Sequence, residues 1–332
     1  MKTDLSPIGE IHKILFAVSL RPCQGTRFQP TGFPDLGAAT FQAPDGGTAL
    51  LVESCQSMAN HLEATCWSEA ECDLVEPVTG ISYIRVEENG NYLTSSVTES
   101  HRINSPYILE SEDKSFFDKL VGKFDAMKNR PINRKLFVET LLKYDIGSLL
   151  HGVFIAKGEI TGGRLRVERA MSAFIEAHGV QTAASGGVKK DQVNPEKDEK
   201  KGLTAEKGFG HVPFHRDEFT AKEITAFFNI DLAQIRGYGL GDDVTNLLIL
   251  LALFKVRALL DSDLRLRTAC YLEVADDASL TATNVEFPLP ALADIIADLP
   301  AAIDACKDKM TRETVIYVEK QAKKKASKIG AE

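Results

Sequence analysis

The sequence predicts an α+β fold built on a ferredoxin-like βαββαβ unit, and three features of residues 222–275 carry this prediction. First, more polar neighbours alternate with the apolar residues Ile224, Ala226, Phe228, Ile230 and Leu232, which is the period of a half-buried strand. Second, residues 244–260 are apolar on nearly every side, which predicts a buried helix; their length and the internal Lys255 and Arg257 argue against a membrane span. Third, residues 264–274 alternate again, so strand, helix and strand form half of the unit.

The strand predicted at 264–274 has one apolar face and one face with Arg265, Arg267 and Tyr271. The helix at 244–260 must lie under the sheet, so the other face of the sheet is free to present these three side chains. RNA-recognition folds use this face for stacking and phosphate contact. A solvated strand face explains the same residue types, so both interpretations stay open. Asp242 follows three glycines, and we expect it to cap the helix.

The other elements follow from the same patterns along the chain. Residues 14–20 predict a buried first strand, and the Gly- and Pro-rich residues 21–39 cannot be regular structure for long. Residues 48–67 predict a helix whose core stripe is Leu51, Cys55, Met58 and Leu62. Further strands are predicted at 81–87, 92–97, 149–156 and 164–180, a strand or helical turn at 316–320, and helices at 114–127, 133–144 and 289–309. We interpret residues 69–145 as an insertion between the first helix and the second strand of the unit.

Several polar side chains could contact a nucleic acid. Arg27 and Gln29 flank Phe28, a trio able to touch a phosphate and stack a base. Small polar groups lie near the middle of the helix predicted at 48–67, namely Ser54, Gln56, Ser57 and Asn60; such groups are just as often merely solvated. Arg169 falls in phase with the apolar residues of its strand, so it needs an anionic partner or a strand end that lets it reach solvent.

Residues 181–219 form a long excursion between two predicted strands of one sheet. The first two thirds of it have almost no apolar side chains and cannot form a packed core, which indicates a functional arm or a disordered loop. At its end, Phe214 lies between His211 and Arg216, which makes it a candidate for stacking.

The charge distribution restricts the partners of the chain. The net charge of −8 argues against indiscriminate binding of nucleic acids. However, residues 120–170 contain ten Lys or Arg and only five Asp or Glu, so this block is basic and the remainder of the chain is strongly acidic. Such segregation allows a basic groove on an acidic body, and it would also let the acidic surface of one copy meet the basic surface of another.

Other classes of protein find no support in the sequence. We find no targeting signal, and six cysteines without framework spacing fit a reducing cytoplasm. No phosphate-binding loop, dinucleotide fingerprint or nucleophile elbow is present. His61, Cys66 and Cys72 match no standard zinc spacing, and helix capping explains Asp242 and Asp243 more simply than a metal. We therefore predict no cofactor, no metal and no catalytic residue.

Long ordered blocks of the sequence resemble a known family. They are RPCQGTRFQPTGFPDLG after the first strand, LVESCQSMANHLE, SSVTESHRINSPYI, RLRVERAMSAFIEAHGV, and VPFHRDEFTAKEI before the final strand–helix–strand. Together they cover roughly residues 9–275 and resemble the backbone subunit of type I-G (formerly I-U) CRISPR surveillance complexes, the Cas-seven group of the RAMP superfamily.

The resemblance implies an RRM-like palm, an inserted finger region and a thumb hairpin. The palm would comprise residues 1–68, 148–180 and 222–288, the finger region 69–147, the thumb 181–221, and a C-terminal helix with a basic tail 289–332. It also implies contacts to the guide backbone from Arg27, Gln29, Ser54, Gln56, Ser57, Asn60 and Arg169, with thumb contacts from Lys189, Lys190, Phe214, His215 and Arg216.

The implied function is a non-catalytic, cytoplasmic subunit that binds the CRISPR guide RNA (crRNA). Copies would stack head-to-tail along the guide with other subunits of the Cascade complex, and target DNA would pair with the guide. Contacts to phosphates and sugars suit this role, because the guide sequence varies. The alternative is a RAMP endoribonuclease, for which Asp35 is the residue to suspect; an unrelated ferredoxin-like protein is the third interpretation.

Overall fold

The protein is described by a computed structural model over residues 2–33, 37–127, 130–160, 162–193, 202 and 204–319. A seven-stranded sheet with the order β16-β17-β1-β15-β12-β5-β4 organises the chain, and every neighbouring pair in it is antiparallel. Its strands are β1 (Lys13–Pro22), β4 (Thr40–Gln42), β5 (Thr48–Glu53), β12 (Met171–His178), β15 (Glu223–Asp231), β16 (Leu264–Arg267) and β17 (Cys270–Val274). With helices packed on this sheet, the predicted α+β class is confirmed.

The three long strands bury only one of their faces. Every second residue of β12 and β15 is buried, as the alternation at 224–232 predicted, while the residues between them are half-exposed. Helix α7 (Asp242–Asp261) packs against α1 (Cys55–Ala64), α6 (Leu232–Gly237) and α8 (Leu292–Asp304). On the half-exposed face, the rings of Phe174 and Phe227 stack with their centroids 5.0 Å apart. One face therefore forms the core, and the other is partly open to solvent.

Helix α7 confirms the predicted buried helix, but its start differs from the prediction. Gly241 is the N-cap residue, and no side chain caps the helix. Gly241 has a φ of 92°, a conformation that L-residues rarely adopt, so the glycine sets the entry angle of the chain. Asp242 and Asp243 are the first helical residues, where their charge favours the helix dipole.

The single strand predicted at 264–274 is a hairpin of β16 and β17. Ala269 lies in the turn with a φ of 62°, and the register shifts between Arg265 and Arg267. Arg265 and Tyr271 lie opposite each other and are exposed, whereas Arg267 is only partly exposed and pairs with the buried Glu53. The prediction that all three side chains share one free face is therefore wrong for Arg267.

The helix predicted at residues 48–67 begins later than predicted, and part of its predicted core stripe is not buried. Residues 48–53, expected in a helix, form β5 because Ala49, Leu50 and Val52 are buried in the sheet; the helix α1 begins only at Cys55. Of the predicted core stripe of this helix, Met58 and Leu62 are buried and Cys55 is exposed.

The strand predicted at 149–156 is helix α5 (Gly147–His151) followed by β10 (Val153–Ile155). The strand predicted at 164–180 is β11 (Leu165–Val167) followed by β12. β10 and β11 pair with each other outside the main sheet, so neither of them extends it.

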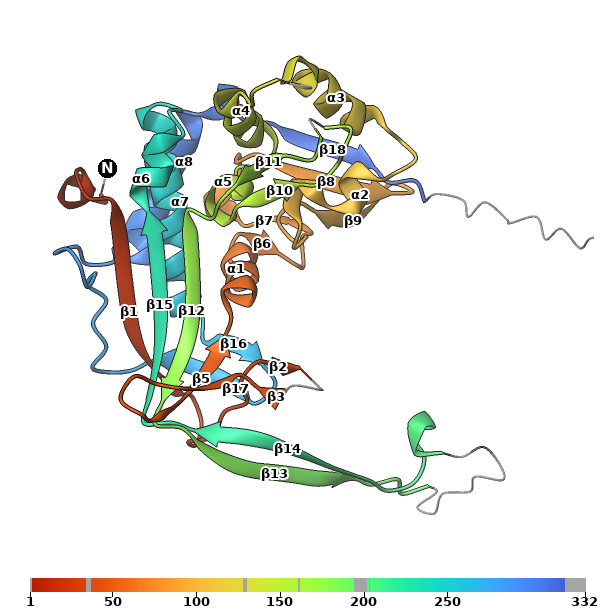
Figure 1. Cartoon of the computed structure of the whole chain (residues 1–332), viewed down its shortest axis with the longest axis vertical. Helices are drawn as coiled ribbons and strands as arrows, with labels where there is room; N and C mark the ends of the chain where they lie inside the picture. Colours follow the sequence, from red (N-terminus) through yellow and green to blue (C-terminus); the bar gives the residue numbers. More distant parts are fainter. Residues whose placement is uncertain are drawn as a thin grey trace, which may run out of the picture.

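The insertion forms a separate layer at the upper right of Figure 1. It contains β7 (Asp73–Leu74), β8 (Tyr83–Glu88), β9 (Asn91–Ser95), α2 (Pro106–Leu109), α3 (Ser115–Phe124) and α4 (Arg134–Tyr144). The short strand β6 (Trp67–Ser68), which pairs with β7, lies directly before it. Asn89 and Gly90 join β8 to β9 with φ values of 53° and 79°, as a tight hairpin turn requires. Strand β18 (Arg312–Ile316) returns from α8 and pairs in parallel with β8, which anchors the C-terminal segment to the insertion.

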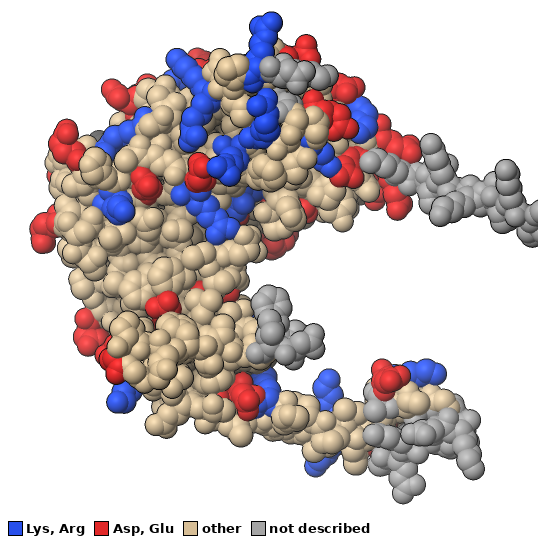
Figure 2. All heavy atoms as spheres, viewed as in Figure 1, with Lys and Arg blue, Asp and Glu red and all other residues tan. Residues whose placement is uncertain are grey.

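The excursion predicted at 181–219 contains a projecting two-stranded hairpin. β13 (Gln181–Lys189) and β14 (Val212–Thr220) pair antiparallel along their whole lengths, and the hairpin extends away from the body (Figure 1). The two strands approach so closely at Gly186 that an added Cβ would lie 2.7 Å from the carbonyl oxygen of Phe214. Figure 2 shows a wide hollow between this hairpin and the insertion, so the molecule is C-shaped.

Among the described helices, none combines the length and the apolar character that crossing a bilayer requires.

Candidate functional site

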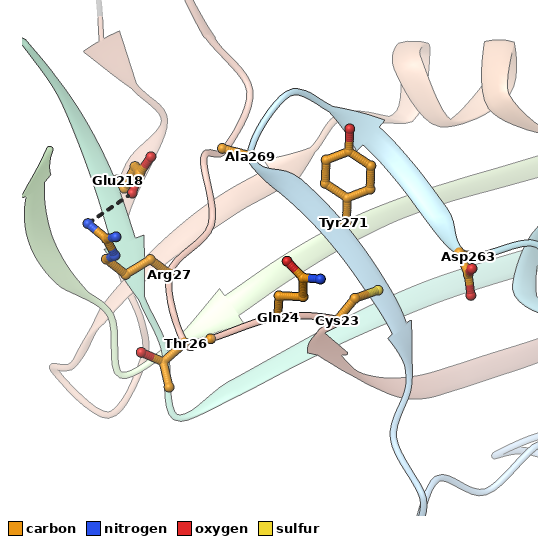
Figure 3. Close-up of a pocket in the computed structure, with 9 residues that line it drawn as sticks. Cys23, Gln24, Thr26, Arg27, Glu218, Asp263, Ala269 and Tyr271 are labelled. Atoms are coloured by element: carbon orange, nitrogen blue, oxygen red, sulfur yellow. Dashed lines mark ion pairs between the residues drawn. The ribbon is translucent and has the colours of Figure 1, made fainter. Parts of the chain in front are cut away.

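A buried carboxylate brings two of the predicted arginines together at the base of the hairpin. Arg27 lies in the loop after β1, and its Nη1 is 3.4 Å from Oε2 of Glu218 on β14 (Figure 3). Arg216, on the same strand, donates to Oε1 of Glu218 from Nε at 2.9 Å and from Nη2 at 2.5 Å. The Glu218 side chain is 6% exposed, whereas that of Arg27 is 56% exposed. The carboxylate thus fixes two guanidinium groups that still reach solvent.

Backbone pairing joins the loop after β1 to the hairpin. The N–H and C=O of Phe28 both bond to Phe219 at 2.9 Å, and both rings are buried. The side chain of Phe28 is therefore part of the core, and it is not available to stack a base. The pairing nevertheless holds Arg27 and Gln29 beside β14.

A second ion pair fixes the loop at Gln29. Arg267 donates from Nη1 to the carbonyl oxygens of Gln29 at 3.1 Å and Val52 at 3.2 Å, and it forms an ion pair with Glu53. Burial lowers the pKa of Arg267, but a guanidinium remains charged at neutral pH. Gln29, His215 and Arg216 line one hollow of about 720 Å³ beside this pair.

The predicted residues of helix α1 form a second cluster with Arg169. Arg169 lies between β11 and β12, so a strand end frees its side chain from the core, and Nη2 donates to Oε1 of Gln56. Ser54 caps the helix by accepting a bond from the N–H of Ser57 at 3.3 Å, which gives Ser54 a structural role. Gln56 and Asn60 are exposed, so polar groups of α1 and Arg169 share one surface.

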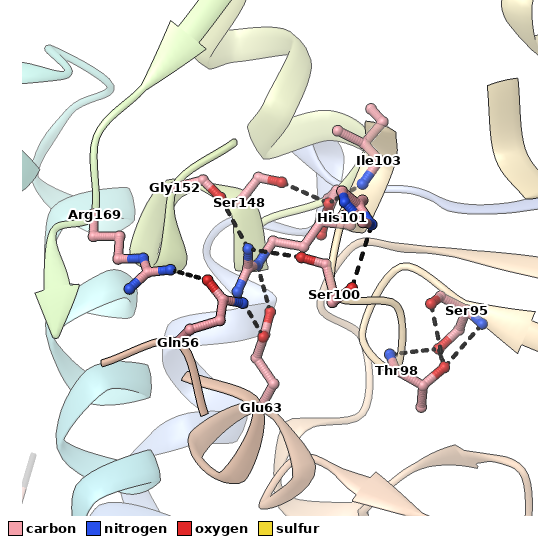
Figure 4. A network of polar contacts seen from close by, with 12 residues as sticks. Gln56, Glu63, Ser95, Thr98, Ser100, His101, Ile103, Ser148, Gly152 and Arg169 are labelled. Atoms are coloured by element: carbon pink, nitrogen blue, oxygen red, sulfur yellow. Dashed lines mark hydrogen bonds and ion pairs between the residues drawn. The ribbon is translucent and has the colours of Figure 1, made fainter. Parts of the chain in front are cut away.

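A buried ion pair orients this second cluster (Figure 4). Arg102 donates to both carboxylate oxygens of Glu63, at 2.6 and 2.7 Å, and to the carbonyl oxygen of Gly152 at 3.2 Å. Glu63 is the last buried residue of α1. Gly152 lies close to Arg169, because an added Cβ at Gly152 would lie 3.0 Å from the backbone nitrogen of Arg169. Arg102 thus connects the insertion to both elements that carry Gln56 and Arg169.

The remaining predicted residues lie along the hairpin, and of these only His215 borders the first cluster. Lys189, Lys190 and His215 are exposed, and Phe214 is 47% exposed with its ring over Gly187. The hairpin therefore carries cations and one aromatic ring on a narrow ribbon.

A basic surface over α4, β10 and β11 was not singled out in the sequence, although the basic block of residues 120–170 was counted. Figure 2 shows Lys and Arg gathered over α4, β10 and β11. Arg134 and Arg166 flank Glu168 at 3.8 and 3.7 Å, and Phe154 lies opposite Arg166 with 54% of its surface exposed. The alternation of arginines in residues 164–169 was the available signal, but their nearness to α4 depends on the tertiary fold.

Metal-ligating side chains are not grouped in the described part of the chain. No three His, Cys, Asp or Glu side chains there form a group that could hold a metal ion. Asp35, the residue suspected for the endoribonuclease alternative, lies outside the described residues. His151 is completely buried, and burial together with Lys255, Arg102 and Arg169 lowers its pKa well below the ordinary value. It is a neutral core residue and not an exposed acid or base.

Comparison with known proteins identifies the class of this chain. Residues 14–182, just over half of the chain, match the family model described as CRISPR-associated protein GSU0053. The chain is thus a CRISPR-associated protein. It belongs to the GSU0053 family. This confirms that the chain belongs to a CRISPR-associated family, as the resemblance implied, while the role of backbone subunit and the I-G subtype stay predictions.

Two solved structures show more distant similarity. A chain of a structure described as "CRISPR RNA-guided surveillance complex, pre-nicking" is 13% identical with a TM-score of 0.40, over 87% of this chain and 99% of that chain. Csc2 of Thermofilum pendens is 9% identical with a TM-score of 0.30, over 93% and 83%. Because both TM-scores are below 0.5, the assignment depends on the family model. No curated protein sequence matches the chain.

Proposed function

We propose that the protein is a non-catalytic backbone subunit of a type I CRISPR effector complex that binds the guide RNA through its sugar–phosphate chain. The observation that carries this proposal is the pair of guanidinium groups of Arg27 and Arg216, which the buried Glu218 holds at the base of the hairpin. Guanidinium groups bind phosphate oxygens without reading bases, so they suit a guide whose sequence varies.

The strand order supports a division into palm, finger and thumb. In the order β17-β1-β15-β12, with α1 and α7 packed together, the chain has the connections of a βαββαβ unit. We assign the palm to residues 1–68, 148–180 and 222–288, the finger region to 69–147 and the thumb to 181–221.

The guide contacts that we propose fall into three groups. Arg27, Gln29 and Arg216 would hold one phosphate segment, and Gln56, Ser57, Asn60 and Arg169 the next, with Ser54 keeping α1 in place. Lys189, Lys190, Phe214 and His215 would contact RNA from the hairpin. The C shape supports head-to-tail stacking, because the hollow in Figure 2 is open to the hairpin of a neighbouring copy. Target DNA and other Cascade subunits would join through the guide.

Salt-dependent binding tests the proposal directly. Binding of a repeat-containing RNA should weaken linearly with the logarithm of salt concentration, and each RNA phosphate contact contributes about 0.7 to the slope. Arg27→Ala and Arg169→Ala should each reduce the slope by about that amount, whereas Lys307→Ala, far along the chain on an exposed turn, should leave it unchanged. Equal slopes in all proteins would refute the proposed contacts. In a separate incubation of the protein with the RNA and a divalent metal ion, recovery of shortened RNA would favour the endoribonuclease alternative instead.

A further inference from the structure

A small cavity of about 20 Å³ lies where helices α1 and α7 meet the insertion. Its lining includes Glu63 of α1, Lys255 of α7 and Asp145, the residue that follows α4. The volume is that of a site for a single water molecule, because a water needs about 10–15 Å³ of such space. None of these three residues belongs to the guide contacts proposed above.

Four buried charged side chains lie in the lining of this cavity or directly behind it. Glu63, Arg102 and Lys255 are each 4% exposed, and Asp145 is 1% exposed. Two of them are cations and two are anions, so the cluster as a whole is neutral. His151, on which the charge of Lys255 also acts, is a neutral imidazole and does not change this balance. A neutral buried cluster is tolerated when each of its members is also hydrogen-bonded.

Direct hydrogen bonds satisfy three of the four charged groups. Arg102 donates to both oxygens of Glu63, at 2.6 and 2.7 Å. Oδ2 of Asp145 accepts from Oγ of Ser148 at 2.6 Å and from the N–H of Ile103 at 3.1 Å, in the network of Figure 4. These bonds fix both carboxylates at the wall of the cavity.

Lys255 is the exception among the four. Within the described part of the chain, no hydrogen bond or ion pair joins its ammonium group to another residue, although its charge acts on Glu63. Its neighbours Phe254 and Val256 are buried as well, so the side chain has no route to bulk solvent. A buried ammonium without an acceptor is strongly unfavourable. An acceptor inside the cavity that Lys255 lines would remove this cost.

We propose that this cavity holds one ordered water molecule, which accepts a hydrogen bond from Nζ of Lys255 and donates to the neighbouring carboxylates. A water molecule both accepts and donates, so it fits a space that a cation and two anions line. A further cation or an anion would leave the cluster with a net charge, whereas a neutral molecule does not. The inference goes beyond the proposed function, because it concerns how the molecule is held together and not what it binds.

The water connects three parts of the chain that are distant in sequence. Glu63 lies near the end of α1, Lys255 in the second half of α7, and Asp145 at the end of the insertion. Because α1 also carries Gln56 and Asn60, the bridge fixes the helix of the second cluster against the insertion and against α7.

A high-resolution crystal structure of the full-length protein tests the site without any substitution. We expect electron density for one water molecule about 2.7–3.2 Å from Nζ of Lys255, and at a similar distance from an oxygen of Glu63 or Asp145. A direct bond between Lys255 and one of these carboxylates, or a cavity without density, would overturn the proposal.

Oxygen-17 relaxation dispersion counts long-lived internal water molecules in solution and tests the site a second time. Gly147 lines the cavity, and an added Cβ there would meet only Oδ1 of Asp145 within 4 Å, at 3.3 Å. Gly147→Ala should therefore fill the space and lower the count by one. The matched control Gly122→Ala adds the same methyl group to α3, where nothing lies within 4 Å, and should leave the count unchanged. Equal counts in both variants would contradict the proposal.

The role of the ammonium group is tested by a third pair of variants. Lys255→Met leaves Arg102 as the one cation for two buried carboxylates, so the unfolding temperature should fall by at least about 5 °C. Arg257→Met, on the same helix, removes a cation whose pair with Asp261 is partly exposed, and should change it by no more than about 2 °C. Equal unfolding temperatures would show that Lys255 does not balance the carboxylates. RNA plays no part in these measurements, so their outcome is independent of the proposed function.

Discussion

The Arg102 side chain shows most clearly how single residues hold the second cluster. Both it and Glu63 are about 5% exposed, and two hydrogen bonds of 2.6 and 2.7 Å join them. Burial raises the pKa of Glu63, and the charge of Arg102 opposes that effect. Arg102 also has a φ of 52°, which is unfavourable for a residue with a side chain. The chain keeps this conformation because the side chain connects α1 to Gly152.

Removing Arg102 should strongly destabilise the protein. Arg102→Met leaves the Glu63 carboxylate buried without its partner, which should lower the free energy of unfolding by about 3–5 kcal/mol. Chemical denaturation monitored by circular dichroism measures this loss. The double variant Glu63→Leu with Arg102→Met should recover most of it, because no buried charge remains unpaired. A double variant as unstable as the single one would show that the ion pair is not the cause.

His151 predicts a pH dependence of stability. Burial and the nearby positive charges lower its pKa well below 6.5, and neither ring nitrogen has a hydrogen-bond partner in the described residues. The unfolded chain therefore binds a proton that the folded chain does not, so stability is complete above pH 6.5 and is lost as the pH falls below it. The slope from this one group approaches about 1.4 kcal/mol per pH unit.

The pH profile of a His151→Phe variant separates this effect from those of other groups. Buried Glu63 and Asp145 have raised pKa values and change stability with pH in the opposite direction, so the wild-type profile alone is not decisive. The difference between wild type and variant isolates the imidazole. Two parallel unfolding profiles between pH 7 and pH 5 would contradict the prediction.

At the scale of elements, the sequence predicted those helices and turns that hydrogen bonds within the same segment stabilise. Residues 134–144 form a helix with Asn133 as its N-cap, and Asn89-Gly90 forms a turn, because these sequences satisfy their own backbone groups. Residues 48–53 have helical spacing but form β5, since pairing with β12 and β4 outweighs a weak preference. β18 could not be predicted as part of the insertion, because its partner β8 lies more than two hundred residues earlier.

The hairpin should be a separable element. β13 and β14 pair mainly with each other, and Glu218 and Phe219 are the buried residues at its base. Replacing residues 186–210 by a short turn should therefore change the unfolding temperature of the body by no more than a few degrees, since little apolar surface is removed from the core. Differential scanning calorimetry measures this. Insoluble protein would contradict the assignment of this segment as an arm.

The candidate site was predictable in its residue types but not in its geometry. Arg27 and Arg216 were named from the sequence, yet Glu218, which joins them, was missed. Phe214, Arg216 and Glu218 alternate along β14, so the strand period could have placed the acid on the same face as the arginine. Tyr271 was named, but on a strand face with Arg267, because the turn at Ala269 depends on long-range pairing.

At the scale of the whole molecule, an acidic chain can bind a polyanion only if its charges are separated. Lys and Arg gather over α4, β10 and β11 (Figure 2), whereas the net charge is −8. Binding of RNA by one copy should therefore be modest and strongly salt-dependent. Successive copies would add contacts along one guide, and neighbouring hairpins would connect them.

Assembly along the guide should depend on the hairpin even though the fold does not. With a long guide RNA, the full-length protein should form complexes with several copies, and the variant shortened at residues 186–210 should bind as separate copies with lower affinity, since no hairpin then reaches the neighbouring copy. Native mass spectrometry counts the copies on each RNA. The matched control keeps the hairpin length and replaces only Phe214 by Ala, which should weaken assembly less than the deletion. Equal copy numbers for the shortened and full-length proteins would show that the hairpin does not join neighbours, because the deletion leaves the rest of the molecule unchanged.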